Sequence, residues 1–142
     1  MTRCGLVVTT CERPDALARV LASVGAQTLA PDEVLVAEDG VSPATAAVVR
    51  AFAARSRAPV RHLTQSHDGF RAGRIRNAAI AATTCDYVLL VDGDMLLHPE
   101  FVADHVALAR PGHYSQGVRI PLDVTATRRH LATSAGLPGV FD

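Results

Sequence analysis

Residues 72–94 read AGRIRNAAIAATTCDYVLLVDGD and pass from a helical pattern through a strand to an acidic turn. The small apolar residues of the first part recur at helical spacing, which predicts a helix from residue 72 to residue 82. Its inward-facing side chains are expected to be those of Ile75, Ala79 and Ile80. The run YVLLV at 87–91 is continuously apolar, which is typical of a central strand covered on both faces.

The same alternation of strand and helix extends through the rest of the chain. Short runs rich in β-branched residues predict further strands at 4–10, 33–37, 60–63 and 114–120. Apolar helical spacing predicts helices that begin near Pro14, Pro43 and Pro99, because proline suits the first turn of a helix. This order predicts the α/β fold class, with a mostly parallel sheet and helices on both faces.

The length and charge of the chain limit its function. With 142 residues, of which 49% are hydrophobic, the sequence fits a single compact domain over residues 1–142. The formal net charge is zero, which argues against a general polyanion binder, so no nucleic-acid partner is expected. No apolar run is long enough to span a bilayer and no signal-peptide pattern precedes the first strand, so the cytoplasm is the expected location.

The three cysteines, Cys4, Cys11 and Cys85, are scattered and odd in number. They contain no C-x-x-C pair, so the sequence predicts neither a disulfide framework nor a zinc site. We interpret them as buried thiols in a reducing compartment.

Acidic residues follow two of the predicted strands, where the ligands of parallel sheets usually bind. Asp92 and Asp94 come directly after the apolar run and are separated by Gly93, which lets a ligand approach the backbone closely. Two carboxylates at this spacing suit Mg²⁺ or Mn²⁺, and the alternative is a solvated turn. Asp39 ends the second predicted strand, where it is either a hydrogen-bond acceptor for a nucleobase or ribose or part of an Asx turn.

Arginines gather in and just after the polar loop that precedes residue 72. Arg71, Arg74 and Arg76 are able to hold phosphate oxygens, and the alternative is a charged surface. The first strand is not followed by the G-x-G-x-x-G pattern, and the chain has no lysine with which to form a P-loop. Binding of dinucleotides in the Rossmann manner and P-loop chemistry are therefore not expected.

Three stretches resemble the inverting glycosyltransferases of family 2, which have the GT-A fold. They are LVVTTCERPDAL at 6–17, SVGAQTLAPDEVLVAEDG at 23–40 and DGFRAGRIRNAAIAATTCDYVLLVDGDMLLHPEFV at 68–102. The last is the most specific and is similar to the G-F-R…R-N…D-x-D segment of bacterial polysaccharide and chondroitin-type polymerase domains. The resemblance implies a Rossmann-like GT-A sheet that binds a nucleotide-diphosphate sugar, with UDP as the expected nucleotide.

The resemblance also implies a role for each matching residue. Thr9 and Glu12 would line the nucleoside pocket, and Asp39 would accept a hydrogen bond from the base. Arg71 and Arg76 would steady the nucleotide or its phosphates. Asp92 would face the ribose or the metal, and Asp94 would hold Mn²⁺ or Mg²⁺ on the diphosphate.

The acceptor of the sugar is expected to be a saccharide or a lipid-linked molecule, with peripheral association at the inner face of the membrane. In this family the acceptor-side half follows the D-x-D half and supplies the general base, so we expect that half to be absent and assign no catalytic residue. The remaining acidic candidates, Glu100, Asp104 and Asp123, have no motif behind them. The alternative function is a non-catalytic nucleotide-sugar-binding module, or a truncated and inactive gene product.

Overall fold

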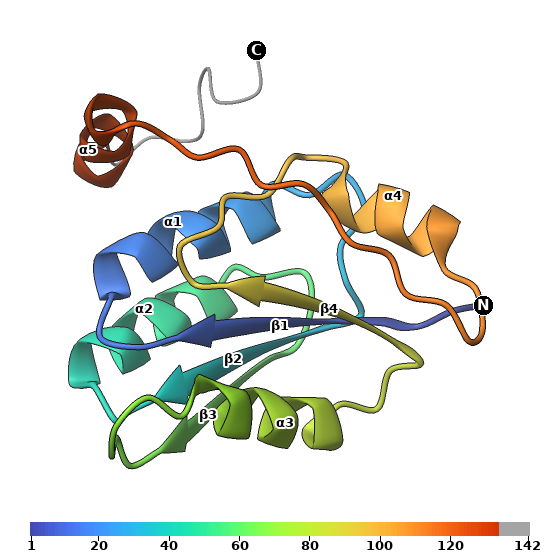
Figure 1. Cartoon of the computed structure of the whole chain (residues 1–142), viewed down its shortest axis with the longest axis horizontal. Coiled ribbons are helices and arrows are strands. Elements are labelled where there is room, and N and C mark those ends of the chain that lie inside the picture. The colour runs from blue at the N-terminus through green and yellow to red at the C-terminus, as the bar shows by residue number, and fades with distance from the viewer. Residues whose placement is uncertain (134–142) are drawn as a thin grey trace.

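The computed structural model describes residues 1–133 and consists of a parallel sheet with helices on both faces (Figure 1). The elements in chain order are β1 (Cys4–Thr10), α1 (Pro14–Gly25), β2 (Glu33–Asp39), α2 (Pro43–Ala53), β3 (Val60–Gln65), α3 (Ala72–Ala82), β4 (Tyr87–Asp92), α4 (Phe101–Leu108) and α5 (Val124–Ala132). The predicted order of strands and helices is confirmed up to α4. No helix among the described residues is both long and apolar enough to cross a membrane.

The four strands lie in the order β3-β2-β1-β4, and every neighbouring pair is parallel. All four arrowheads in Figure 1 therefore point the same way, and the loops that leave them meet at one edge of the sheet. Parallel strands require crossover connections, which α1, α2 and α3 provide.

The sheet has a thickly packed face and a thinly packed face. The large core cluster gathers side chains of β1, β2 and β4 such as Leu6, Val36 and Val91 with those of α1, α2 and α4. The small cluster joins Ile75 and Ala79 of α3 to the opposite faces of β1 and β2. The prediction of helices on both faces is confirmed, and α3 alone among the described helices contributes to the small cluster.

Two buried polar side chains, Ser23 in α1 and Gln27 just after it, hold the segment that follows β4. Ser23 Oγ accepts a hydrogen bond from Leu97 N at 3.1 Å. Gln27 donates to His98 O at 2.8 Å and accepts from Val102 N at 2.9 Å. These bonds anchor the chain just beyond the acidic turn at 92–94, so the turn is held from both sides.

Three sequence predictions are wrong. The strand expected at 114–120 does not form, because this segment pairs with no strand of the described part of the chain and its side chains are exposed. The run at 87–91 forms β4, but as an edge strand of the described sheet with Leu90 47% exposed, rather than a central strand. Ile80 is 39% exposed, because the small cluster under α3 reaches only Ile75 and Ala79.

Candidate functional site

Thr9, Asp39 and Asp92 lie at or next to the ends of three strands and share one face of the sheet. Side chains alternate between the faces of a strand, so residues an even number apart point the same way. Each of the three lies an even number of residues after a side chain that packs against α3, namely Val7, Ala37 and Val88. These three polar side chains therefore all face the α3 side.

Arg76, in the second turn of α3, joins two of these strand ends. Its Nη2 donates to Asp92 Oδ1 at 3.0 Å, and its Nε donates to Thr9 Oγ1 at 3.3 Å. Thr9 and Asp92 are direct partners in the register of β1 and β4, so a single guanidinium spans both strands. Arg76 was predicted to steady the nucleotide, and its donors here orient Thr9 and one oxygen of Asp92.

Asp39 is nearly inaccessible to solvent and is held by donors from the loop before α3. Gln65 Nε2 donates to its Oδ1 at 2.9 Å, and Arg71 N donates to its Oδ2 at 3.0 Å. These two hydrogen bonds, that from Gln65 first, lower the pKa of the Asp39 carboxyl below its ordinary value, with a further contribution from His67. A carboxylate has about four lone-pair positions, so Asp39 retains the capacity to accept from a ligand once the groups that cover it move.

Arg71 lies immediately before α3, and its side chain contacts other residues of the loop between β3 and α3. Its Nη2 donates to Ser66 O at 2.8 Å and lies 3.8 Å from Asp68 Oδ2. Its Nε is buried and has no hydrogen-bond partner among residues 1–133. A buried donor without an acceptor costs free energy, so this atom indicates a place that an acceptor from a ligand would fill.

The acidic turn after β4 depends on Gly93. Gly93 N donates to Thr9 O at 2.7 Å, and a Cβ at this position would meet Thr10 Cβ at 2.9 Å and Thr9 O at 3.0 Å. Only glycine allows β1 and the turn to approach this closely. Asp94 is exposed and makes no hydrogen bond with the described residues, while Asp92 keeps its Oδ2 free of hydrogen bonds.

The turn after β1 contains a strained residue. Glu12 has a φ of +49°, in the left-handed region that residues other than glycine rarely adopt. Strain of this kind persists where the surrounding structure holds it, often beside a functional site. Glu12 is exposed at the same edge of the sheet as Thr9, and its place near the nucleoside stays a prediction.

Two features of this edge were not predicted. Arg119 Nη1 lies 3.8 Å from Asp92 Oδ2, which brings the segment after α4 to the end of β4. Cys11 Sγ lies 3.9 Å from His67 Nδ1, which in turn lies 3.6 Å from Asp39 Oδ1. The cysteines were expected to be buried, and only Cys4 is, because Cys11 and Cys85 are half-buried.

The acidic residues considered as a general base have structural partners or lie on the surface. Asp123 Oδ1 accepts from Ala126 N at 2.7 Å and caps α5. Glu100 Oε2 accepts from Thr28 Oγ1 at 2.8 Å, and Asp104 is exposed on α4. None of these contacts brings the three carboxylates to the strand ends.

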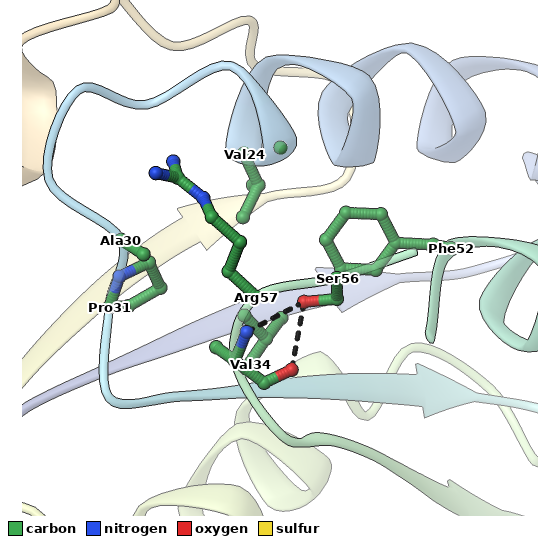
Figure 2. A pocket seen from close by; sticks show the side chains of 9 residues that line it. Val24, Ala30, Pro31, Val34, Phe52, Ser56 and Arg57 are labelled. Atoms are coloured by element: carbon green, nitrogen blue, oxygen red, sulfur yellow. Dashed lines mark hydrogen bonds between the residues drawn. The ribbon is translucent and has the colours of Figure 1, made fainter. Parts of the chain in front are cut away.

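The small cavity in Figure 2 lies away from this edge. It is enclosed by Val24, Pro31, Val34 and Phe52 at the amino end of β2, with the Ser56 hydroxyl bonded to the backbone of Ala58 beside it. Its volume is about 10 Å³, which is room for about one water molecule. It is therefore a packing gap and not a binding site.

Comparison with known proteins agrees on one family. The model of the family described as "Glycosyl transferase family 2" matches residues 6–136. A hyaluronan synthase of Pasteurella multocida is 32% identical over 103 residues, which are 72% of this chain and 10% of that protein.

Two solved structures share the fold. TarS 1-349 of S. aureus in complex with UDP-GlcNAc has a TM-score of 0.63 at 25% identity, over 74% of this chain and 30% of that chain. The mannosyltransferase PcManGT of Pyrobaculum calidifontis, in complex with GDP-Man and Mn²⁺, has a TM-score of 0.68 at 22% identity, over 78% of this chain and 33% of that chain. The chain thus spans a third or less of the length of each of these proteins.

Proposed function

Since the chain belongs to glycosyl transferase family 2, we propose that it binds a nucleoside-diphosphate sugar through a divalent metal for inverting transfer of the sugar to a saccharide acceptor. The expected fold is confirmed, because the all-parallel sheet matches glycosyltransferases of the GT-A type. TarS binds UDP-GlcNAc, which supports a UDP-sugar as the donor of this chain.

The observation that carries the proposal is the convergence of three strand ends beside α3. Thr9, Asp39 and Asp92 all face the α3 side, and Arg76 bridges two of them. The buried and unpaired Nε of Arg71 adds a donor for an anionic or carbonyl oxygen. A nucleotide offers such oxygens on its base, ribose and phosphates, which makes it a suitable ligand for this set of groups.

The residues of the acidic turn fit a hard divalent cation. Asp94 is exposed and carries no hydrogen bond from the described residues, and Asp92 offers the oxygen that Arg76 leaves free. Two carboxylates are an incomplete shell for Mg²⁺ or Mn²⁺, which usually complete it with water and substrate phosphates. The ion would therefore bind together with the diphosphate. The Mn²⁺ in the structure of PcManGT agrees with this choice of metal.

Each residue of the site has a separate role in donor binding. The cation, when bound, neutralises the charge that develops on the leaving diphosphate. Asp39 accepts from the base, Thr9 and Glu12 line the nucleoside pocket, and Arg71 steadies the phosphates. Arg76 orients Asp92 by holding Oδ1, and it leaves Oδ2, which lies 3.8 Å from Arg119 Nη1, without a hydrogen bond from α3. An acceptor hydroxyl needs a general base, which we do not assign among residues 1–133.

Calorimetry with UDP tests the proposal directly. We expect UDP to bind in the presence of Mn²⁺ and to lose most of its affinity in EDTA, because Asp94 would hold the ion and the ion would offset the charge of the diphosphate. Asp94→Asn should weaken the Mn²⁺-dependent part of the affinity. Asp104→Asn is the matched control, since Asp104 is also an exposed aspartate but lies on α4.

Equal affinity for UDP with Mn²⁺ and with EDTA would disprove the metal-dependent mode. If Asp94→Asn binds UDP with unchanged Mn²⁺-dependent affinity, Asp94 is not part of the site. Release of sugar or diphosphate from UDP-sugars, measured with the same preparation, separates an active transferase from a module that only binds the donor.

A further inference from the structure

A second group of metal-ligating side chains lies at the same edge of the sheet as the acidic turn. Cys11 follows β1, Asp39 ends β2, and His67 belongs to the loop between β3 and α3. One ligand atom from each lies within 4.8 Å of the other two. Within residues 1–133 this is the one cluster of three or more His, Cys, Asp or Glu side chains with that spacing.

We propose that Cys11, Asp39 and His67 form a Zn²⁺ site, separate from the Mg²⁺ or Mn²⁺ site of Asp92 and Asp94. A thiolate, an imidazole and a carboxylate are ligands that zinc binds with three protein groups and one open position. Hard cations such as Mg²⁺ and Mn²⁺ favour all-oxygen sets, so the two groups of residues select different metals.

Two of the three ligand separations are close to those around a tetrahedral ion. Zinc bond lengths and a tetrahedral angle place sulfur and nitrogen ligands about 3.6 Å apart, and nitrogen and oxygen ligands about 3.4 Å apart. The observed separations are 3.9 Å for Cys11 Sγ to His67 Nδ1 and 3.6 Å for His67 Nδ1 to Asp39 Oδ1. The His67 side chain is 43% exposed and sits on a loop, so a movement of a few tenths of an ångström is available to it. Cys11 Sγ lies within 4.8 Å of the Asp39 carboxylate, and the turn that carries Cys11 has to bring the sulfur to about 3.6 Å from it.

The carboxylate of this site is already oriented. Gln65 donates to Asp39 Oδ1 and Arg71 N donates to Oδ2, so the side chain has one fixed rotamer before a metal arrives. Hydrogen bonds of this kind to metal ligands fix their direction and raise affinity. Each Asp39 oxygen has a second lone pair, so Oδ1 is able to bind a metal while Gln65 remains bonded.

The electrostatic potential at Cys11 favours a cation. Partial burial, followed by the negative charges of Asp39, Glu12 and Glu38, raises the pKa of the Cys11 thiol. Without a metal the thiol is therefore protonated at neutral pH. Zn²⁺ displaces this proton to the buffer as the Zn–S bond forms, and the thiolate and carboxylate together balance the charge of the ion.

Zinc at this position would compete with the nucleotide. This consequence rests on the proposed function, in which Asp39 accepts a hydrogen bond from the base. An ion bound to Asp39, Cys11 and His67 would cover that acceptor, so Zn²⁺ would lower the affinity for UDP. The Zn²⁺ site itself depends only on the three side chains and is tested by its own affinity measurement, without a nucleotide.

The direct test is titration of the metal-free, reduced 142-residue chain with Zn²⁺, and with Co²⁺ as a spectroscopic probe. We expect one tight Zn²⁺ site and a thiolate-to-Co²⁺ charge-transfer band in the near ultraviolet. Cys11→Ser should remove the band. Both Cys11→Ser and His67→Gln should lower the affinity for Zn²⁺ by more than the roughly 10- to 100-fold that loss of an outer-shell partner costs.

Cys85→Ser and His113→Gln are the matched controls, because Cys85 is another half-buried thiol and His113 another exposed imidazole outside the cluster. Both should leave Zn²⁺ affinity unchanged. Absence of a stoichiometric Zn²⁺ site in the wild type would overturn the proposal. Equal Zn²⁺ affinity in wild type and Cys11→Ser, or loss of the Co²⁺ band in Cys85→Ser, would do the same.

UDP titrations with Mn²⁺, with and without Zn²⁺, test the consequence for the donor. Weaker UDP binding with Zn²⁺ in the wild type, but not in Cys11→Ser, supports a shared position. A tight Zn²⁺ site that leaves UDP affinity unchanged would keep the metal site and contradict the role of Asp39 in base recognition. The failure of one proposal is thereby distinguishable from the failure of the other.

Discussion

Glu38 and Asp39 are consecutive carboxylates with nearly the same burial, yet they serve opposite faces of the sheet. Glu38 points to the thick face, where Oε2 bonds His62 Nε2 at 2.8 Å and Oε1 accepts from Ser42 N at 2.9 Å. Asp39 points to the α3 face, where its partners come from the loop that borders the proposed nucleotide site. The alternation of a strand thus assigns one acid to the fold and its neighbour to the site.

The two carboxylates also differ in the kind of segment that surrounds them. Glu38 joins β3 to the residue that caps α2, and both are regular elements. Asp39 is bordered by Cys11 and His67, which lie in connecting segments, and His67 is exposed. A ligand is therefore able to reach Asp39 by displacing loop side chains, whereas access to Glu38 would require opening the core.

The largest effect is expected for removal of Glu38. Glu38→Ala leaves Ser42 N without its partner and His62 without its acceptor, and unpaired buried groups cost about 1–3 kcal/mol each. We expect the free energy of unfolding, measured by urea titration, to fall by about 3 kcal/mol. UDP affinity of the folded variant should change little, since Glu38 faces away from the site.

A double-mutant cycle sharpens this result. The cycle consists of His62→Gln, Glu38→Gln and the variant with both changes. It should give a coupling free energy that differs from zero, because the two side chains contact each other. Additive losses of stability would mean that the contact between Glu38 and His62 contributes nothing to the fold.

The second effect concerns Asp39 and the choice of base. A carboxylate accepts from the N3–H of uracil but meets no equivalent donor on cytosine, and a site built for a hydrogen bond rejects a ligand that lacks it. We expect the wild type to prefer UDP over CDP and Asp39→Ala to lose about 10- to 100-fold in UDP affinity, as for a charged hydrogen bond. Calorimetry with both nucleotides measures this, and equal binding of UDP and CDP by the wild type would contradict it.

The sequence predicts this site in part because strand alternation is local. The apolar runs before Thr9, Asp39 and Asp92 are enough to predict that polar residues end neighbouring parallel strands. The partner that bridges Thr9 and Asp92 is not predictable in this way, because Arg76 reaches across 67 residues to Thr9. The spacing of residues along the chain does not reveal such a contact.

The wrong predictions have the same origin. Whether YVLLV is central or at the edge depends on which strand lies beyond it, and nothing in the run itself specifies that neighbour. The segment 114–120 has the composition of a strand, yet a strand needs a partner and this segment has none among residues 1–133. The group of Cys11, Asp39 and His67 was missed because its members come from three separate parts of the chain and form no spaced motif.

The third effect tests the close approach of the acidic turn to β1. In Gly93→Ala the added Cβ meets Thr10 Cβ at 2.9 Å and Thr9 O at 3.0 Å, so the turn or β1 has to shift. Overpacking typically costs about 1–3 kcal/mol. We expect this loss in the free energy of unfolding, together with weaker Mn²⁺-dependent UDP binding, because Asp92 and Asp94 move with the turn.

Gly73→Ala is the control for this variant, since a Cβ at Gly73 meets nothing within 4 Å and the residue lies in α3. It should keep its metal-dependent binding and be as stable as the wild type or slightly more stable, because alanine favours a helix. Wild-type stability in Gly93→Ala would show that the turn tolerates a side chain and that glycine is not required there.

The smallest effect is the pH dependence of stability that Asp39 contributes. Its hydrogen bonds lower the pKa of the carboxyl in the folded state below the value in the unfolded chain. Ionised Asp39 therefore stabilises the fold above the unfolded pKa, near 4, and this contribution is lost as the pH falls through the lowered folded pKa. The wild type should lose stability in this acidic window, and Asp39→Asn should lose less because it has no proton to take up.

Asp104→Asn, which changes an exposed aspartate of α4, serves as the control and should follow the wild type. Urea titrations between about pH 2 and pH 6 measure the slopes, and parallel curves for wild type and Asp39→Asn would mean that the bonds from Gln65 and Arg71 do not distinguish the charged from the neutral carboxyl.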